Sequence, residues 1–152
     1  FIEELLTVIL EGIQSKKDYI DQVCEKYMHM ENLKQIETQF NTAIADIATL
    51  FDEKIYPIGE TRFRQKSDFY SLFACVIELR ENGYVVINKE NLTKVRENLK
   101  KMDEEISPSS SEPEYLEYAT RCLSDANSDV NRIWRKDFIK RQIADLYYKK
   151  GE

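Results

Sequence analysis

The residues of this chain best suited to chemistry begin with a basic cluster that lies just before a segment of helical periodicity. Arg62, Arg64 and Lys66 alternate with other residues, Phe63 separates the two arginines, and Asp68 follows. In an extended segment such alternation places the three cations on one side. The free backbone N–H groups of a helix N-terminus favour anions, so the cluster suits a phosphate or an acidic partner. The alternative is structural: the arginines bridge helices through carboxylates, and Phe63 anchors the loop.

A second polar cluster, Ser124–Arg132, precedes the last periodic segment. Asp, Asn and Ser are the side chains that cap helices, so closing a helix–turn–helix corner is one role for this cluster. Its polar residues exceed what one cap needs, which favours a buried polar network or a contact with another domain. The candidate binding residues here are Asp125, Asn127, Asn131, Arg132 and, further along, Arg135.

Residue patterns typical of catalysis are missing. His29 is the single histidine of the chain. A zinc site or a Ser-His triad needs at least one well-placed histidine and usually more. The four glycines are isolated, so no phosphate-binding loop is expected. The acidic runs Asp52-Glu53 and Asp103-Glu104-Glu105 have no partnering pattern, and we interpret them as solvated faces. We therefore expect no catalytic residue, no metal and no cofactor.

The charge distribution argues against a general polyanion binder, because the net charge is −6. Residues 1–60 hold 12 acidic and 5 basic side chains, whereas residues 132–150 hold 2 acidic and 7 basic ones. These basic residues of the last helix have two alternative roles. They contact DNA, or they face solvent and complement the negative end of the helix dipole. Three widely spaced cysteines and the lack of a long apolar run predict a cytoplasmic protein without a membrane span.

The periodicity predicts a single all-α domain over residues 1–152, with about seven helices in an orthogonal or bundle-like arrangement and no substantial β-sheet. A start without Met, already in helical rhythm, suggests a fragment of a longer protein. Tyr84–Ile87 is expected to be an extended connection, and Ser107–Ser111 a mobile surface loop. The expected helices are 1–14, 16–28, 33–56, 66–82, 88–106, 111–123 and 129–149.

The positions of the two polar clusters make a spatial prediction. The first enters the fourth helix and the second enters the seventh, and both helices have wide apolar arcs. If these helices pack in parallel, the clusters meet and their cations and helix N-termini form an anion site. Antiparallel packing places the clusters at opposite ends.

Three segments resemble a helical region of one bacterial family: Ile2–Tyr27, Phe63–Phe73, and Ser124–Ser128 with Asn131-Arg132. The family is the ParB-like, GmrSD-type group of modification-dependent restriction and phage-defence proteins. Its catalytic part is an N-terminal ParB-like domain with an Asp-Gly-Gln-Gln-Arg motif, credited with nucleotide hydrolysis and DNA cleavage. That motif is absent here, so no catalytic residue of the family is carried over.

What the resemblance implies is a non-catalytic helical domain. Its implied partners are the N-terminal ParB-like domain of the same protein, DNA, or a second copy in a homodimer. The alternative is a purely structural or dimerisation module that makes no contact with nucleic acid.

Overall fold

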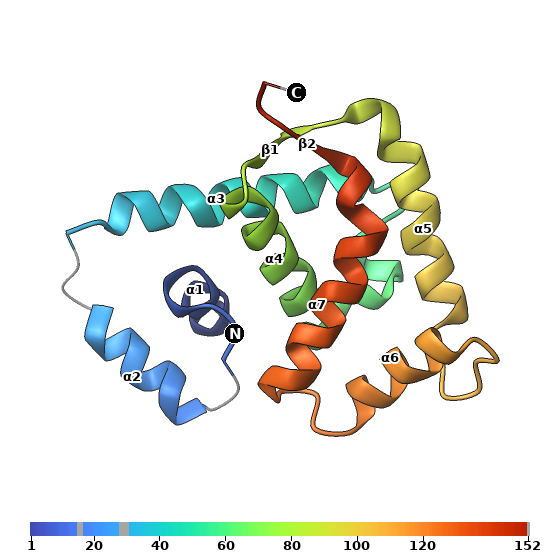
Figure 1. Ribbon diagram of the computed structural model, residues 1–152, viewed down its shortest axis with the longest axis horizontal. Coiled ribbons are helices and arrows are strands. Elements are labelled where there is room, and N and C mark those ends of the chain that lie inside the picture. The colour runs from blue at the N-terminus through green and yellow to red at the C-terminus, as the bar shows by residue number, and fades with distance from the viewer. Residues whose placement is uncertain (15–16, 28–30, 152) are drawn as a thin grey trace.

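The computed structural model describes residues 1–14, 17–27 and 31–151, and within them it confirms the all-α prediction (Figure 1). Seven α-helices are joined by short 3-10 turns and accompanied by one two-stranded sheet. The helices are α1 (Ile2–Glu11), α2 (Lys17–Tyr27), α3 (Leu33–Leu50), α4 (Lys66–Glu81), α5 (Leu92–Glu105), α6 (Pro113–Leu123) and α7 (Asp129–Ile143). The strands are β1 (Tyr84–Ile87) and β2 (Tyr147–Lys149).

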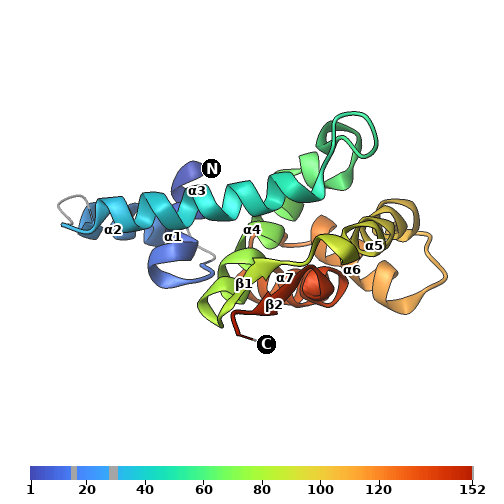
Figure 2. The same ribbon diagram turned by 90° about the horizontal axis from the view of Figure 1, so that it is seen from above.

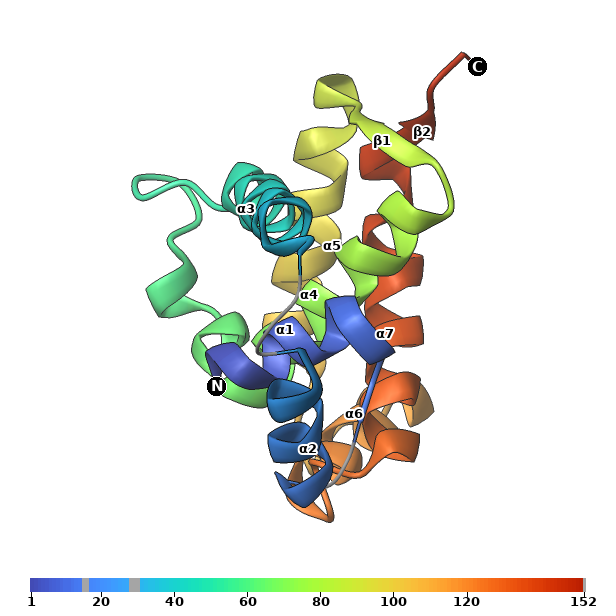
Figure 3. The ribbon, with the colours of Figure 1, turned by 90° about the vertical axis from the view of Figure 1, so that its left-hand side faces the viewer.

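Helix α4 is the centre of the core. Every residue from Tyr70 to Ile77 is buried, because apolar or small side chains occupy all sides of the helix there. It packs against α1, α3 and α7, which surround it in Figures 1 and 3. The helix ends as predicted at Asn82-Gly83, where Gly83 has φ 85°, a left-handed conformation that favours glycine.

Helices α4 and α7 run parallel. The Arg132 guanidinium lies over the Tyr70 ring near the start of both helices, and Lys140 pairs with Glu78 near their ends. Side-chain contacts thus advance in the same direction along both helices. The condition for the two polar clusters to adjoin is met.

Two expected features around residues 51–65 are wrong. Helix α3 ends at Leu50 rather than near Tyr56, since Asp52 forms a turn in which its carboxylate accepts the N–H groups of Lys54 and Ile55. Residues 62–64 form a 3-10 turn instead of an extended segment, capped by the Thr61 hydroxyl, which accepts the N–H of Phe63. The expected alternation of cations on one side therefore does not occur.

The last helix is shorter than predicted, and Tyr84–Ile87 is a strand rather than an unpaired connection. Helix α7 ends at Ile143, and Tyr147–Lys149 then pairs antiparallel with β1, with Ile87 opposite Tyr147. Each strand supplies the hydrogen-bonding partner of the other, and the two lie far apart in the sequence. Neither could be recognised as a strand alone.

The starts of α5 and α6 also differ from expectation. Asn88 caps a 3-10 turn, Lys89–Asn91, which leads into α5. Helix α6 begins at Pro113 after Glu112, so Ser111 is not its N-cap. The single histidine lies outside the described residues, as do the expected ends of the second helix at residues 16 and 28.

Helices α1, α2 and α3 form one side of the molecule. Figure 2 shows α3 as a long helix whose first half extends away from α4 toward α2. Helix α1 packs against α2, α3 and α4, so it connects this part to the core.

Candidate functional site

Arg62 connects four elements in the interior. Its backbone N–H donates to Asp103 Oδ1 at 2.8 Å, and its Nη1 donates to the Met102 carbonyl at 3.4 Å. Its guanidinium lies over the Tyr118 ring, 4.6 Å from the centroid. Its Nε is 3.4 Å from Asp68 Oδ2 but makes no hydrogen bond, so the two charges interact by proximity alone. Arg62 thus connects α4, α5 and α6, as expected if the arginines of this cluster bridge helices instead of binding a ligand.

Asp68 is buried and acts as an internal acceptor. The Tyr118 hydroxyl donates to its Oδ1 at 2.6 Å, and the Cys122 thiol lies 3.8 Å from the same atom. Burial, together with the Asp68 charge, raises the pKa of Cys122 to about 11 and raises the pKa of Tyr118 well above its usual value. Both groups keep their protons at neutral pH, which suits hydrogen-bond donors and not nucleophiles.

Asp103 was expected to lie on a solvated face, but it belongs to this internal network. Its Oδ2 accepts the hydroxyl of Tyr56 at 2.6 Å, while its Oδ1 accepts the backbone of Arg62. Burial, reinforced by this carboxylate, raises the pKa of Tyr56. Nothing local in the sequence marks Asp103, because both of its partners lie before α4.

Arg135 is fully buried and holds the corner between α6 and α7. Its Nη1 donates to the Arg121 carbonyl at 2.6 Å, and its Nη2 donates to the Ala126 carbonyl at 2.7 Å. Its Nε lies 3.4 Å from the Ser71 hydroxyl. Among the described residues no carboxylate forms an ion pair with it. The guanidinium binds the carbonyl of Arg121 in the last turn of α6 and that of Ala126 in the connection that follows, and capping a helix C-terminus suits a cation.

Arg132 ties α7 to α1 and the residues after it. Only 3% of its surface is exposed. It donates to Glu4 Oε1 at 2.7 Å, to the Gln14 carbonyl at 2.5 Å and to Asn127 Oδ1 at 3.3 Å. Its guanidinium lies 4.0 Å from the centroid of the Tyr70 ring. The protein therefore encloses most of this cation, and its remaining edge lines a small hollow beside Glu4 and Asn127.

The remaining residues of the second cluster close the turn. Ser128 caps α7 by accepting the N–H of Asn131 at 3.3 Å. The Asn131 side chain donates to the carbonyls of Ser124 and Asp125, and it accepts from Arg121 at 2.7 Å. Asp125 has φ 50°, a left-handed conformation that Asp tolerates in turns. The predicted corner and the predicted buried network are thus both present.

The two predicted clusters do come together, but most of their cations are engaged inside the chain. The guanidinium groups of Arg62, Arg132 and Arg135 all contact protein acceptors. Arg64 and Lys66 are exposed. Asp125 and Asn127 are also exposed, whereas Asp68 and Asn131 act within the network. A ligand-binding role for these nine residues stays a prediction.

The basic excess of the last helix is largely paired. Lys136 and Lys140 both bond to Glu78, and Arg141 lies 3.1 Å from Glu114. Lys149 lies over the Tyr84 ring. This pairing reduces the positive potential that α7 offers to a polyanion.

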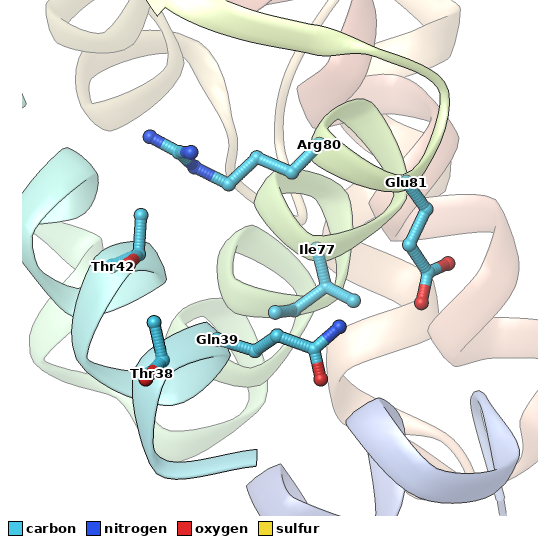
Figure 4. Close-up of a pocket in the computed structure, with 6 residues that line it drawn as sticks. All are labelled: Thr38, Gln39, Thr42, Ile77, Arg80 and Glu81. Atoms are coloured by element: carbon cyan, nitrogen blue, oxygen red, sulfur yellow. The ribbon is translucent and has the colours of Figure 1, made fainter. Parts of the chain in front are cut away.

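A small hollow between α3 and α4 is lined by Thr38, Gln39, Thr42, Ile77, Arg80 and Glu81 (Figure 4). Its volume is about 240 Å³. Arg80 on its wall is committed to Asp46 by two hydrogen bonds of 2.6 and 2.7 Å, and Asp46 also accepts from Tyr147. The Arg80 guanidinium is therefore not free to bind an anion in this hollow.

A larger, apolar groove lies between α1, α2 and α3, and the sequence did not point to it. Its volume is about 480 Å³. Ile2 and Leu33 on its walls are 65% and 60% exposed. The one available signal was the composition of α1, which is apolar on more than one side. Lining the groove are Ile2, Leu6, Leu10, Cys24, Tyr27, Leu33, Ile36, Glu37 and Phe40.

Metal binding and membrane insertion find no support in the part of the chain that the structure describes. The described residues contain no group of three or more His, Cys, Asp or Glu side chains that could hold a metal ion. None of the helices in the described ranges is long and apolar enough to cross a membrane. Comparison with protein families, characterised proteins and solved structures finds no match to this chain.

Proposed function

We propose that this chain is a non-catalytic helical interaction module that docks onto a protein partner. The proposal rests on a contrast between the arginines and the groove. The guanidinium groups of Arg62, Arg132 and Arg135 are hydrogen-bonded within the chain, whereas the apolar groove of about 480 Å³ is open to solvent. Buried cations consolidate a scaffold, whereas an exposed apolar surface marks a site of protein contact.

The resemblance to GmrSD-type proteins supplies the setting of this proposal. There the module belongs to a cytoplasmic restriction or phage-defence protein, and its partner is the ParB-like domain of the same protein. Docking through the groove requires no catalytic residue in this chain, which agrees with the absence of a phosphate-binding loop.

DNA contact is the second candidate, and one observation favours it. Arg64 and Lys66 are exposed beside the first turn of α4, where free N–H groups favour phosphate. The net charge of −6 argues against DNA binding, because an acidic protein repels the phosphate backbone. Two exposed cations would give weak and strongly salt-dependent binding.

A salt titration of DNA binding tests the proposal. Fluorescence anisotropy with a labelled duplex should show no binding, or binding that Arg64→Ala with Lys66→Ala does not change. Binding that weakens with a log–log slope of roughly −0.9 per phosphate contacted, and that is lost in the double variant, would replace docking by DNA contact.

Nucleotide hydrolysis provides a second test. The purified chain should not hydrolyse ATP or GTP above the rate of buffer. Turnover that a substitution within the chain abolishes would contradict the non-catalytic assignment.

A further inference from the structure

Helix α1 carries two apolar faces, and the core uses one of them. Leu5 and Val8 are buried among the core residues. Ile2, Leu6 and Leu10, spaced by four residues, line the groove instead. A helix that is apolar on more than one side is normally enclosed by other elements. Among the described residues, however, no element covers this second face of α1.

The opposite wall of the groove has matching helical spacing. Leu33, Ile36 and Phe40 lie along the first half of α3, and Phe40 also packs against Phe73 of α4, with 5.5 Å between the ring centroids. The stripe from Ile2 to Leu10 is about 12 Å long at 1.5 Å per residue. About two turns of helix match this length, and packing an apolar stripe between two helical walls is a recurring mode of peptide recognition.

The charge around the groove selects the partner. Residues 1–50 hold nine acidic side chains and four lysines, and two of these carboxylates, Glu4 and Asp46, are paired with Arg132 and Arg80, which leaves an acidic excess of three (7 − 4) in this part of the chain. Glu37 lines the groove itself. Glu3 and Asp21 line a neighbouring hollow, yet they are near enough to Cys24 on the groove wall that burial and these two carboxylates raise the pKa of its thiol. A basic partner is attracted to such a rim, and an acidic partner is repelled.

A second copy of the chain fits this surface poorly. A two-fold dimer through the groove would place the acidic side of one copy against the same side of the other. Like charges brought together in this way oppose association. The charge pattern therefore favours a different chain over self-association.

We propose that the groove between α1, α2 and α3 binds an amphipathic α-helix whose apolar stripe is flanked by Lys and Arg. This inference rests on the proposed docking role and specifies the chemistry of the partner. Large apolar side chains at i, i+4 and i+7 would occupy the groove, and the basic flanks would face Glu37 and the neighbouring carboxylates.

Designed helical peptides test this inference. The probe has leucines at i, i+4 and i+7 with lysine flanks, one control replaces each lysine by glutamate, and another scrambles the leucines. Isothermal titration should show binding of the lysine peptide, with little binding of either control. Stronger binding of the glutamate peptide would overturn the basic-partner inference and leave groove docking intact.

Substitutions on the chain place the binding site. Leu33 is exposed at the first position of α3, so Leu33→Glu should keep the fold, which circular dichroism verifies. It should weaken binding of the lysine peptide about tenfold or more, as expected for an anchor contact. The matched control is Leu123→Glu, at an exposed leucine on α6, and it should change the affinity less than twofold, within the small effect of a remote surface change. Equal losses in both variants would overturn the assignment to the groove.

Two further results separate this inference from the proposed function. Glu37→Lys should weaken the lysine peptide and strengthen the glutamate peptide, and no change in either would overturn the role given to charge. A concentration-dependent dimer that Leu33→Glu dissociates would replace the partner helix by a second copy. Failure of every peptide, together with salt-dependent DNA binding lost in the Arg64 and Lys66 variants, would remove the docking function itself.

Discussion

Replacing Arg135 by methionine should destabilise the fold without affecting any ligand. Arg135 is fully buried and donates to the carbonyls of Arg121 and Ala126 at 2.6 and 2.7 Å, with a weaker contact to Ser71 at 3.4 Å. Methionine keeps the length and the apolar stem of the side chain. It removes the donors and leaves two carbonyls at the α6–α7 corner without them.

The magnitude follows from those two carbonyls. An unsatisfied buried acceptor costs about 1–3 kcal/mol, and because Arg121 and Ala126 are only partly buried, their two carbonyls together cost toward the lower end of about 2–6 kcal/mol. Methionine also removes a buried cation that has no ion-pair partner among the described residues, and this relief offsets part of the loss. We expect Arg135→Met to lower the free energy of unfolding by about 3 kcal/mol.

Urea denaturation followed by circular dichroism measures this change. The midpoint should fall while the m-value stays constant, because the surface exposed on unfolding is the same. Arg135→Lys should also destabilise, since an ammonium group cannot present the planar fork that reaches both carbonyls. The matched control is Arg64→Met at an exposed site, where a change within about 0.5 kcal/mol is expected.

A loss below about 1 kcal/mol in Arg135→Met would refute the reasoning, because one unsatisfied carbonyl alone should cost more. An equal loss in Arg64→Met would refute it as well. Either result would mean that burial in this corner does not determine the role of the arginine.

Two further predictions concern titration and thiol reactivity. Burial and neighbouring charges raise the pKa of Tyr56, Tyr118 and Tyr147, so the folded state holds these phenol protons more tightly than the unfolded state. The contribution of these tyrosines to stability should be constant below pH of about 10 and fall above it by up to about 1.4 kcal/mol per pH unit and tyrosine. Phenolate absorbance from these residues should appear only on unfolding, and their titration in the folded protein at the usual pKa would contradict this. Alkylation at pH 8 should modify Cys24 before Cys75, which is fully buried with a raised pKa, and equal rates in the folded protein would contradict the core position of Cys75.

Local patterns in the sequence determined the helices. The apolar spacing that runs from Leu33 into α3, the apolar α4 and the Asn82-Gly83 stop each depend on residues within a few turns of one another, and the structure has all three. Capping by Ser128 was also readable locally, because the cap and its N–H donor are three residues apart. Such features need no knowledge of the rest of the chain.

The candidate site was predicted only in part. The sequence located the two polar clusters and raised a buried network as one reading of the second, and the parallel packing of α4 and α7 brings their helix starts together. It could not show which way each guanidinium turns. Arg62 reaches α5 and α6, and Arg132 reaches Glu4, through contacts that form only when distant segments pack. Asp103 was misread for the same reason.

Tertiary structure alone decided the strand pair, the destinations of the arginines and the groove. A segment of four residues is a strand only when it pairs with another strand. The partner of β1 is β2, which follows α5, α6 and α7 in the sequence. The groove exists because α1 turns one apolar face to α4 while α2 and α3 flank the other. The composition of α1 fixes how much apolar surface it has, and the packing of its neighbours decides which part of that surface stays open.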